Sequence, residues 1–586
     1  MFEKEFLTHK IVLFVALIFI LCFSCNAYLS EKNGISSQEG ATYAISNTSE
    51  SLADSPYSSS KYDTEQIQRN VIDQPVFVSL FYIFSYVDEI AKQPINNSIL
   101  TEPSDYSNKT WTERSYYTNL LSVSEDNQFQ YDRVLENCVL SQRAPLYYYL
   151  LHTVSSLFGS LHLFRLGFSI NVLFLFCTAF CILTMGKKYF HSSFAGLAAA
   201  LMYSLSIGCF SSMVCATPYI MVSFFLVLAA RIHLSILRKN TTPIYLYEAL
   251  ALVNVIGNLT DYSYLSFSVL IGLCFIVALT LLRRPKEILC YITFQLVSLL
   301  VTILIYPAAV LHVSTVIIQA FHRLKYNFQM DMFQKNCMTN LDTLGSQLFM
   351  HTGILLFFVL LLLVVFAIFL KRGSFLSHLS HFLERMSTGD VADLLIPAIL
   401  FLYFAGITIF EPADNYFVLT TLLPFLALVV SYVTYRLCNA AIHSEFNSGV
   451  LGILVTCVLC VITITTSTPK YLYADTIDKT SFAQSHSEEY CIFLSSDTLK
   501  ASDHILELEK YEHSLFLSRD RIKSLKKDQT FLSQDSVLVY LSTSDYVDSV
   551  IDKIAKFGKF EIVQQVMDYS DENSSHVYVY QLRRKV

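Results

Sequence analysis

Long apolar runs, almost free of charged side chains, recur through most of this chain and limit what it can fold into. A helix of about 20 apolar residues crosses the roughly 30 Å hydrocarbon layer of a bilayer. The composition agrees, because 53% of the 586 residues are hydrophobic and only 15% are charged. Soluble proteins of this size are less apolar. We therefore interpret the chain as a polytopic α-helical membrane protein.

The apolar runs and their breaks predict about 11 transmembrane helices. The first, at residues 1–29, is interpreted as an N-terminal anchor, because its apolar part at 11–29 is followed by no small-x-small cleavage site. The others belong to a transmembrane bundle at 163–467 and are placed near 163–185, 192–213, 216–236, 244–260, 264–282, 287–307, 345–370, 391–410, 416–436 and 447–467.

Basic residues of the short connections predict how the chain is oriented. Alternate connections carry lysines and arginines, whereas the connections near 214, 261–263 and 411–415 carry none. Basic loops favour the cytoplasmic side. We therefore expect a multi-pass protein of the plasma membrane with a cytoplasmic N-terminus. The basic residues are Lys187, Lys188, Arg238, Lys239, Arg283, Arg284, Lys286, Lys371, Arg372, Arg385 and Arg436.

Three segments are expected on the outer face: a long first outer loop at 30–162, a second outer loop at 308–344, and a region at 468–586. The last has short apolar strands (EYCIFLSS, HSLFLS, DSVLVYLS, KFEIVQQVM, HVYVYQL) and an amphipathic helix, DYVDSVIDKIAKFG, that Gly558 would end. Strands mixed with helices predict a small extracytoplasmic α/β domain. It contains no glycine-rich phosphate loop.

Cysteines and net charge carry little information about function. Most of the 14 cysteines stand singly in apolar runs, where a thiol behaves as a small hydrophobic group. No pair of cysteine motifs has the spacing of a zinc site. The formal charge of −7 does not favour nucleic acid as a partner.

Two adjacent carboxylates, Asp88 and Glu89, follow an apolar stretch at 76–87. That stretch is too short for a confident span and fits a helix lying along the membrane surface. Carboxylates at its end would meet reactants from lipid and from water, as a base or a metal ligand. The alternative is a solvated helix end, which is the commoner meaning of an isolated acidic pair.

Other polar side chains are expected at the same membrane face. Arg143 opens the stretch RAPLYYYLLHTVSSLFG, in which Tyr147, Tyr148 and His152 follow. Such aromatic stretches also serve as interfacial anchors. Acidic residues stand at two outer connections and a basic cluster in the second outer loop, and arginine binds phosphate with paired hydrogen bonds. These residues are Asp261, Glu411, Asp414, His322, Arg323 and Lys325.

The pattern resembles membrane-embedded glycosyltransferases of the GT-C superfamily, in particular the bacterial relatives of protein O-mannosyltransferases and lipid A aminoarabinose transferases. The likeness covers about residues 10–467. It rests on Asp88-Glu89 in the first outer loop, on Arg143-Ala144-Pro145-Leu146-Tyr147-Tyr148, and on Leu259-Thr260-Asp261-Tyr262-Ser263. Asn415-Tyr416-Phe417 is similar to an Arg-Tyr-Phe segment of the family.

This sequence departs from the family pattern at four motif positions. Arg143 stands for the usual His, Ala144 for the first Pro of His-Pro-Pro-Leu-Tyr-Tyr, Asp261 for another His, and Asn415 for Arg. These departures allow a divergent substrate or a member without activity.

The resemblance implies inverting transfer of a sugar from a polyprenyl-phosphate donor to a glycan, lipid or protein acceptor. Asp88 would be the general base and Glu89 would orient the site or assist a divalent metal, which the resemblance leaves open. Cationic side chains would stabilise the leaving phosphate, namely Arg143, Arg323 and Lys325. The substrate pocket would be lined by Tyr147, Tyr148, His152, Asp261, Tyr262 and Asp414.

Two other functions fit parts of the sequence. A transporter of lipid-linked sugars would carry charges inside its spans, and almost none are present, since Arg165 and Arg231 stand near predicted helix ends. A catalytically inactive relative fits the motif departures. Transfer activity that depends on Asp88 separates an enzyme from such a relative.

Overall fold

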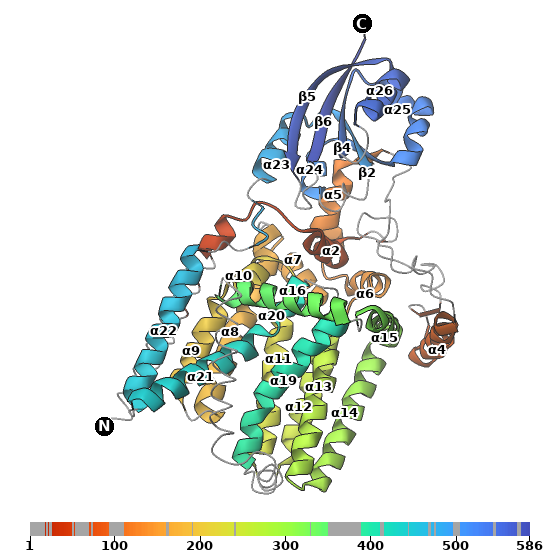
Figure 1. Ribbon diagram of the computed structural model, residues 1–586. Coiled ribbons are helices and arrows are strands. Elements are labelled where there is room, and N and C mark those ends of the chain that lie inside the picture. The colour runs from red at the N-terminus through yellow and green to blue at the C-terminus, as the bar shows by residue number, and fades with distance from the viewer. Residues whose placement is uncertain are drawn as a thin grey trace.

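The fold is described from a computed structural model of the chain (Figure 1). It describes residues 18, 22, 26–49, 52, 70–71, 74–92, 111–159, 163–189, 192–239, 242–327, 330–349, 388–410, 415–442, 445–466, 470–473, 476–495, 504–542, 547–570 and 576–585. Side chains inside these ranges are described except for a few, among them Asp88, Glu89, Arg323 and Lys325.

A bundle of apolar helices forms the larger part of the molecule, and a smaller domain built on a sheet stands at one end of it (Figure 1). Helix packing in this bundle joins near and distant segments, since α9 packs both on α8 and on α21. The bundle helices are α8 (Leu163–Tyr189), α9 (Ser193–Ser204), α10 (Ile207–Val214), α11 (Tyr219–Leu237), α12 (Ile244–Thr260), α13 (Ser263–Leu281), α14 (Pro285–Ile305), α19 (Thr388–Phe410), α20 (Tyr416–Thr420), α21 (Leu423–Ile442) and α22 (Glu445–Thr466).

Five described helices are long and apolar enough to cross a membrane, and a sixth span results if the bent pair α9 and α10 counts as one. The predicted span at 192–213 is this pair, which bends by 51°. The predicted spans at 11–29 and 345–370 lie largely outside the described residues. The membrane character is therefore confirmed, while the number of eleven spans stays a prediction. The five are Leu163–Lys187, Tyr219–Leu237, Ser263–Leu281, Pro285–Ile305 and Tyr416–Asn439.

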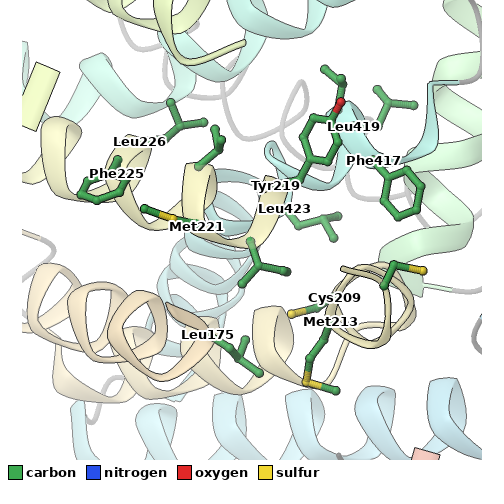
Figure 2. Close-up of a cluster of buried hydrophobic side chains, with 14 of the residues drawn as sticks. Leu175, Cys209, Met213, Tyr219, Met221, Phe225, Leu226, Phe417, Leu419 and Leu423 are labelled. Atoms are coloured by element: carbon green, nitrogen blue, oxygen red, sulfur yellow. The ribbon is translucent and has the colours of Figure 1, made fainter. Parts of the chain in front are cut away.

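The bundle is held by a continuous buried core. Figure 2 shows part of it, where side chains of α8 (Leu175), α10 (Met213), α11 (Leu226) and α20 (Leu419) gather. The rings of Tyr219 and Phe417 stack at 5.8 Å there. Without a hydrophobic drive inside lipid, such close packing is what holds helices together.

Short helices of the first outer loop and two longer helices cover the end of the bundle that faces the sheet (Figure 1). We name this layer the sheet end. The predicted outer loop at 308–344 is helical and belongs to it. The layer consists of α2 (Ser37–Asn47), α4 (Val76–Lys92), α5 (Arg114–Leu121), η4 (Glu125–Asn127), α6 (Tyr131–Leu140), α7 (Leu146–Leu157), α15 (Ala308–Asn327) and α16 (Met330–Phe349).

The C-terminal region forms a six-stranded sheet of order β1-β3-β2-β4-β6-β5. Strands β3, β2 and β4 run parallel, and β4, β6 and β5 pair antiparallel. The five predicted strands and the helix ending at Gly558 are present. The strands are β1 (Thr112–Glu113), β2 (Tyr490–Ser495), β3 (His513–Ser518), β4 (Ser536–Ser542), β5 (Phe560–Ser570) and β6 (His576–Arg584). The helices are α23 (Thr476–Ser485), α24 (Ile505–Leu508), η6 (Arg519–Lys527), α25 (Gln529–Ser533) and α26 (Val547–Gly558).

The sheet is not independent of the first outer loop. That loop supplies the edge strand β1, which pairs antiparallel with β3. The Tyr117 hydroxyl of α5 lies 2.7 Å from the Ser514 hydroxyl, and the Trp111 indole donates to Asp528 at 3.0 Å. One face of the sheet shares the bundle's buried core, and the other has its own core under α26. The two predicted outer segments, 30–162 and 468–586, are therefore built together.

Candidate functional site

Arg143 stands in the turn between α6 and α7 at the sheet end, and its backbone is fixed from two sides. Its amide donates to the Cys138 carbonyl at 2.9 Å, and its carbonyl accepts from the Tyr306 hydroxyl at 3.0 Å. The preceding residue, Gln142, has φ 56°, a left-handed conformation that lets the chain reverse tightly. The local turn and the distant Tyr306 thus set where the Arg143 side chain begins.

The Arg143 guanidinium is enclosed by polar side chains but makes no ion pair with them. Its electrostatic neighbours are Tyr148, Tyr219, Asp261 and Tyr262. Tyr148 above all raises the pKa of the guanidinium beyond its usual range, against the opposing effect of burial. Within the described part of the chain, no carboxylate oxygen lies within 4.0 Å of its nitrogens, and they donate no hydrogen bond. No described residue therefore uses the five N–H donors of the guanidinium, which suit an anion.

The Tyr262 hydroxyl is oriented by a buried histidine that the sequence did not single out. His312 Nε2 lies 3.1 Å from the Val139 carbonyl, and His312 Nδ1 lies 2.8 Å from the Tyr262 hydroxyl. A carbonyl only accepts, so Nε2 carries the proton and Nδ1 accepts from Tyr262. Burial lowers the pKa of His312 to about 3, which keeps the ring neutral. The Tyr262 oxygen thus keeps its lone pairs for a donor such as Arg143.

Asp261 is the one acidic side chain among the electrostatic neighbours of Arg143. It follows α12, and its Oδ1 accepts from the Ser263 amide at 2.9 Å, at the start of α13. This contact satisfies an amide at a helix start, as a capping side chain does. The carboxylate therefore balances part of the arginine charge from a distance without occupying its donors.

A second buried charge centre, Lys32 and Glu39, lies behind the tyrosines of α7. Lys32 Nζ is 2.7 Å from both Glu39 oxygens, it also donates to the Val214 carbonyl, and both side chains are 0% exposed. Glu39 Oε1 accepts from the Ala216 amide at 3.0 Å. Tyr147 interacts electrostatically with Glu39. Sequence analysis missed this pair, because both residues stand in the segment 30–162 that it assigned to a long outer loop.

The pair stabilises the break between α10 and α11. Backbone groups at such a break need partners where water is absent. Asn171 of α8 donates to the carbonyls of Ser212, Met213 and Cys215, at 3.4, 3.2 and 2.6 Å. Lys32 covers the Val214 carbonyl and Glu39 the Ala216 amide. The positive charge lies at the C-terminal end of α10 and the negative charge near the start of α11, the placement that helix dipoles favour.

The structure brings together four of the predicted site residues and places two others elsewhere. Tyr148, Asp261 and Tyr262 are electrostatic neighbours of Arg143, and their role in a site stays a prediction. The Tyr147 hydroxyl instead donates to Asn171 at 3.4 Å, on the side of Glu39. His152 is buried, with Nδ1 2.7 Å from the Ser46 carbonyl of α2, and burial lowers its pKa. Tyr147 and His152 therefore hold the scaffold.

The remaining predicted residues are not tested by the geometry. Asp88 and Glu89 lie on α4, and Arg323 and Lys325 on α15, but their side chains are outside the described part of the structure. Asp414 lies outside the described residues altogether. Among the described residues, no group of three or more His, Cys, Asp or Glu side chains could hold a metal ion.

Comparisons with known proteins give likenesses of fold. No protein-family model matches the sequence, and no curated protein sequence is similar to it. The structure is similar to ArnT from Cupriavidus metallidurans bound to undecaprenyl phosphate, at 9% identity and a TM-score of 0.46, over 98% of each chain. It is also similar to the apo state of that protein, at 9% identity and a TM-score of 0.41, over 75% of this chain and 87% of the other. Since both scores are below 0.5, the function must be argued from this chain's own residues.

Proposed function

We propose that this chain is a membrane glycosyltransferase that transfers a sugar, with inversion, from a polyprenyl-phosphate donor to an acceptor at the outer face of the plasma membrane. The observation that carries the proposal is the Arg143 guanidinium, which has Tyr148, Tyr219 and Tyr262 as electrostatic neighbours and no ion pair among the described residues. An arginine that is always charged and offers paired donors suits a phosphate.

The reaction needs little from Arg143 beyond its charge and donors. An acceptor hydroxyl or amine attacks the anomeric carbon, the bond from that carbon to the phosphate oxygen breaks, and the lipid phosphate leaves with the electron pair. The negative charge on the phosphate grows in the transition state. Fixed donors aimed at that charge lower the barrier because they need no reorganisation. Arg143, with the hydroxyls of Tyr148 and Tyr219 beside it, would supply them.

The acceptor's proton must go to a base, and we assign that role to Asp88, with Glu89 orienting the site. Asp88 lies on α4, whose Ile83 packs in one cluster with Val139 and Tyr306, next to the Arg143 turn. Among the described residues, Glu39 is a buried carboxylate at the sheet end, but both its oxygens contact Lys32. It is therefore a poor base. Arg323 and Lys325 of α15 are further candidates for the phosphate.

Purified full-length Arg143→Gln and Arg143→Lys variants test the phosphate site. We expect Arg143→Gln to weaken binding of undecaprenyl phosphate in nanodiscs and to lower sugar transfer by about 10²–10³-fold, with Arg143→Lys in between. The matched control is Arg133→Gln, which removes an exposed arginine of α6 that is paired with Glu136. If Arg143→Gln binds the lipid phosphate as the wild type does, the phosphate site is elsewhere.

An Asp88→Asn variant tests the reaction itself, by mass spectrometry of envelope glycans with and without the protein. We expect lipid-phosphate binding to persist and product formation to fall. A chain that binds the lipid but forms no product, in either the wild type or the variant, would be the catalytically inactive relative. Unchanged product formation in Asp88→Asn would remove Asp88 as the base.

A further inference from the structure

Helix α4 presents an aromatic stripe that no described part of the chain covers. Phe77, Phe81 and Phe84 are 78%, 81% and 60% exposed, and Val78 beside them is 51% exposed. Their spacing of four and three residues places the three phenylalanines on one side of the helix. Three bare aromatic rings in one row indicate an interaction surface rather than scattered surface residues.

The opposite side of α4 is fixed to the protein. Ile83 is fully buried, in a cluster with Val139, Leu140 and Tyr306. The Ser79 hydroxyl donates to the Val71 carbonyl at 2.9 Å. α4 also packs along α15, and the two lie side by side at the level where α14 ends (Figure 1). The aromatic stripe therefore has a set direction, away from the bundle.

The length of α4 excludes a membrane span. Its uncharged part, residues 76–87, would be about 18 Å long as a helix, whereas the hydrocarbon layer is roughly 30 Å thick. A helix of this kind, with an apolar side and a charged end, lies in the plane of the membrane interface.

The stripe lies on a helix that packs beside the end of the span most exposed to lipid. α14 is the least buried of the five described spans, because only 17% of its most apolar segment is buried inside the protein. Leu296, Leu300 and Ile305 along it are 62%, 56% and 57% exposed. Ile305 ends α14 directly before Tyr306, which belongs to the cluster that holds α4. The occupant of the α4 stripe is thus the same bilayer.

We propose that α4 is an interfacial helix that inserts Phe77, Phe81 and Phe84 into the headgroup boundary of the leaflet nearest the sheet end. The helix thereby connects the membrane surface to the cluster of Ile83, Val139 and Tyr306 beside the Arg143 turn. This proposal does not depend on sugar transfer, because it concerns where α4 lies and not what the site does.

The chain has one tryptophan, Trp111, so tryptophan fluorescence can report depth at single positions. The full-length protein carries Trp111→Phe together with Phe81→Trp, and is reconstituted in phosphatidylcholine vesicles brominated near the ester or near the methyl end of the acyl chains. A second variant with Phe84→Trp guards against a local folding defect. Two controls mark the two extremes of depth. Phe401→Trp replaces the 70% exposed Phe401 in the apolar helix α19. Native Trp111 donates a hydrogen bond to Asp528 of the sheet domain.

We expect residues 81 and 84 to be quenched several-fold more by bromine near the ester than by bromine near the methyl end. Position 401 should show the reverse, and Trp111 no quenching by either lipid. Quenching of positions 81 and 84 by aqueous acrylamide alone would place the stripe in water. No quenching by any of the three agents would mean that a protein partner covers it, and quenching mainly by deep bromine would mean insertion as a span. Each of these three results overturns the proposal.

Discussion

Two cationic centres lie close together at the sheet end, and they differ in how fully they are satisfied. Lys32 contacts both oxygens of Glu39 and a backbone carbonyl, with no exposed surface. Arg143, separated from that pair by the adjacent tyrosines 147 and 148, has hydroxyls and one carboxylate around it but no ion pair among the described residues. A charge is costly to bury, and within the described part of the chain only Lys32 of these two cations has an ion-pair partner.

The difference separates architecture from function. A fully paired ion pair that also covers a helix break is explained by the fold alone. The Arg143 guanidinium is not explained in this way, because no ion pair with a described residue offsets the cost of desolvating its charge. A ligand with negative charge would offset it. The contrast therefore predicts opposite behaviour when each cation is removed.

Lys32→Met should give the largest loss of stability. The variant leaves the Glu39 carboxylate buried without its partner, and breaking a buried pair in this way costs about 3–5 kcal/mol. Thermal unfolding in detergent micelles, followed by intrinsic fluorescence, measures the loss. The double variant Lys32→Met/Glu39→Leu removes both charges and should recover much of it. A double variant as unstable as the single one would mean that the Val214 and Ala216 contacts matter more than the pair.

His312 should make the protein less stable in mild acid. Burial lowers its pKa in the fold to about 3, whereas an unfolded histidine has a pKa near 6.5. Below about pH 6.5 the unfolded chain therefore binds a proton that the folded chain refuses, and stability falls as the pH falls. Between pH 7.5 and 5 this histidine should account for a loss of up to about 2 kcal/mol.

His312→Gln isolates that contribution, since glutamine can donate to the Val139 carbonyl and accept from Tyr262 without titrating. Unfolding midpoints of the wild type and the variant are compared at both pH values. The variant should be less sensitive to acid than the wild type. Equal sensitivity in the two proteins would show that His312 is not held neutral by the fold.

Much of this architecture can be predicted from sequence, because its signals are local. Alternating apolar residues predicted the strands of the sheet domain, and the apolar runs predicted the bundle. The grouping of Arg143, Tyr148, Asp261 and Tyr262 was also expected, from motifs that resemble a family. In these cases each segment carries its own pattern.

The parts that sequence analysis missed depend on long-range contacts. Lys32 and Glu39 stand in a polar stretch without periodicity, and their partners at the α10–α11 break are far away in the chain. His312 lies in the segment 308–344, which was predicted to be a loop and is helical. The break after α9 was missed, although Ser206 caps α10 by accepting from the Cys209 amide. A polar residue inside an apolar run was the available signal.

The smallest effect on stability should come from Arg143→Met. This variant tests whether Arg143 binds a ligand or, like Lys32, stabilises the fold. The guanidinium donates no hydrogen bond to the described residues, so its removal should change the free energy of unfolding by less than about 1 kcal/mol. Thermal unfolding beside Lys32→Met measures this, with Arg133→Met as the exposed control. A small change in stability together with lost lipid-phosphate binding would make Arg143 a ligand-binding residue. If Arg143→Met were as unstable as Lys32→Met, both cations would be structural, and the anion site would lose its physical basis.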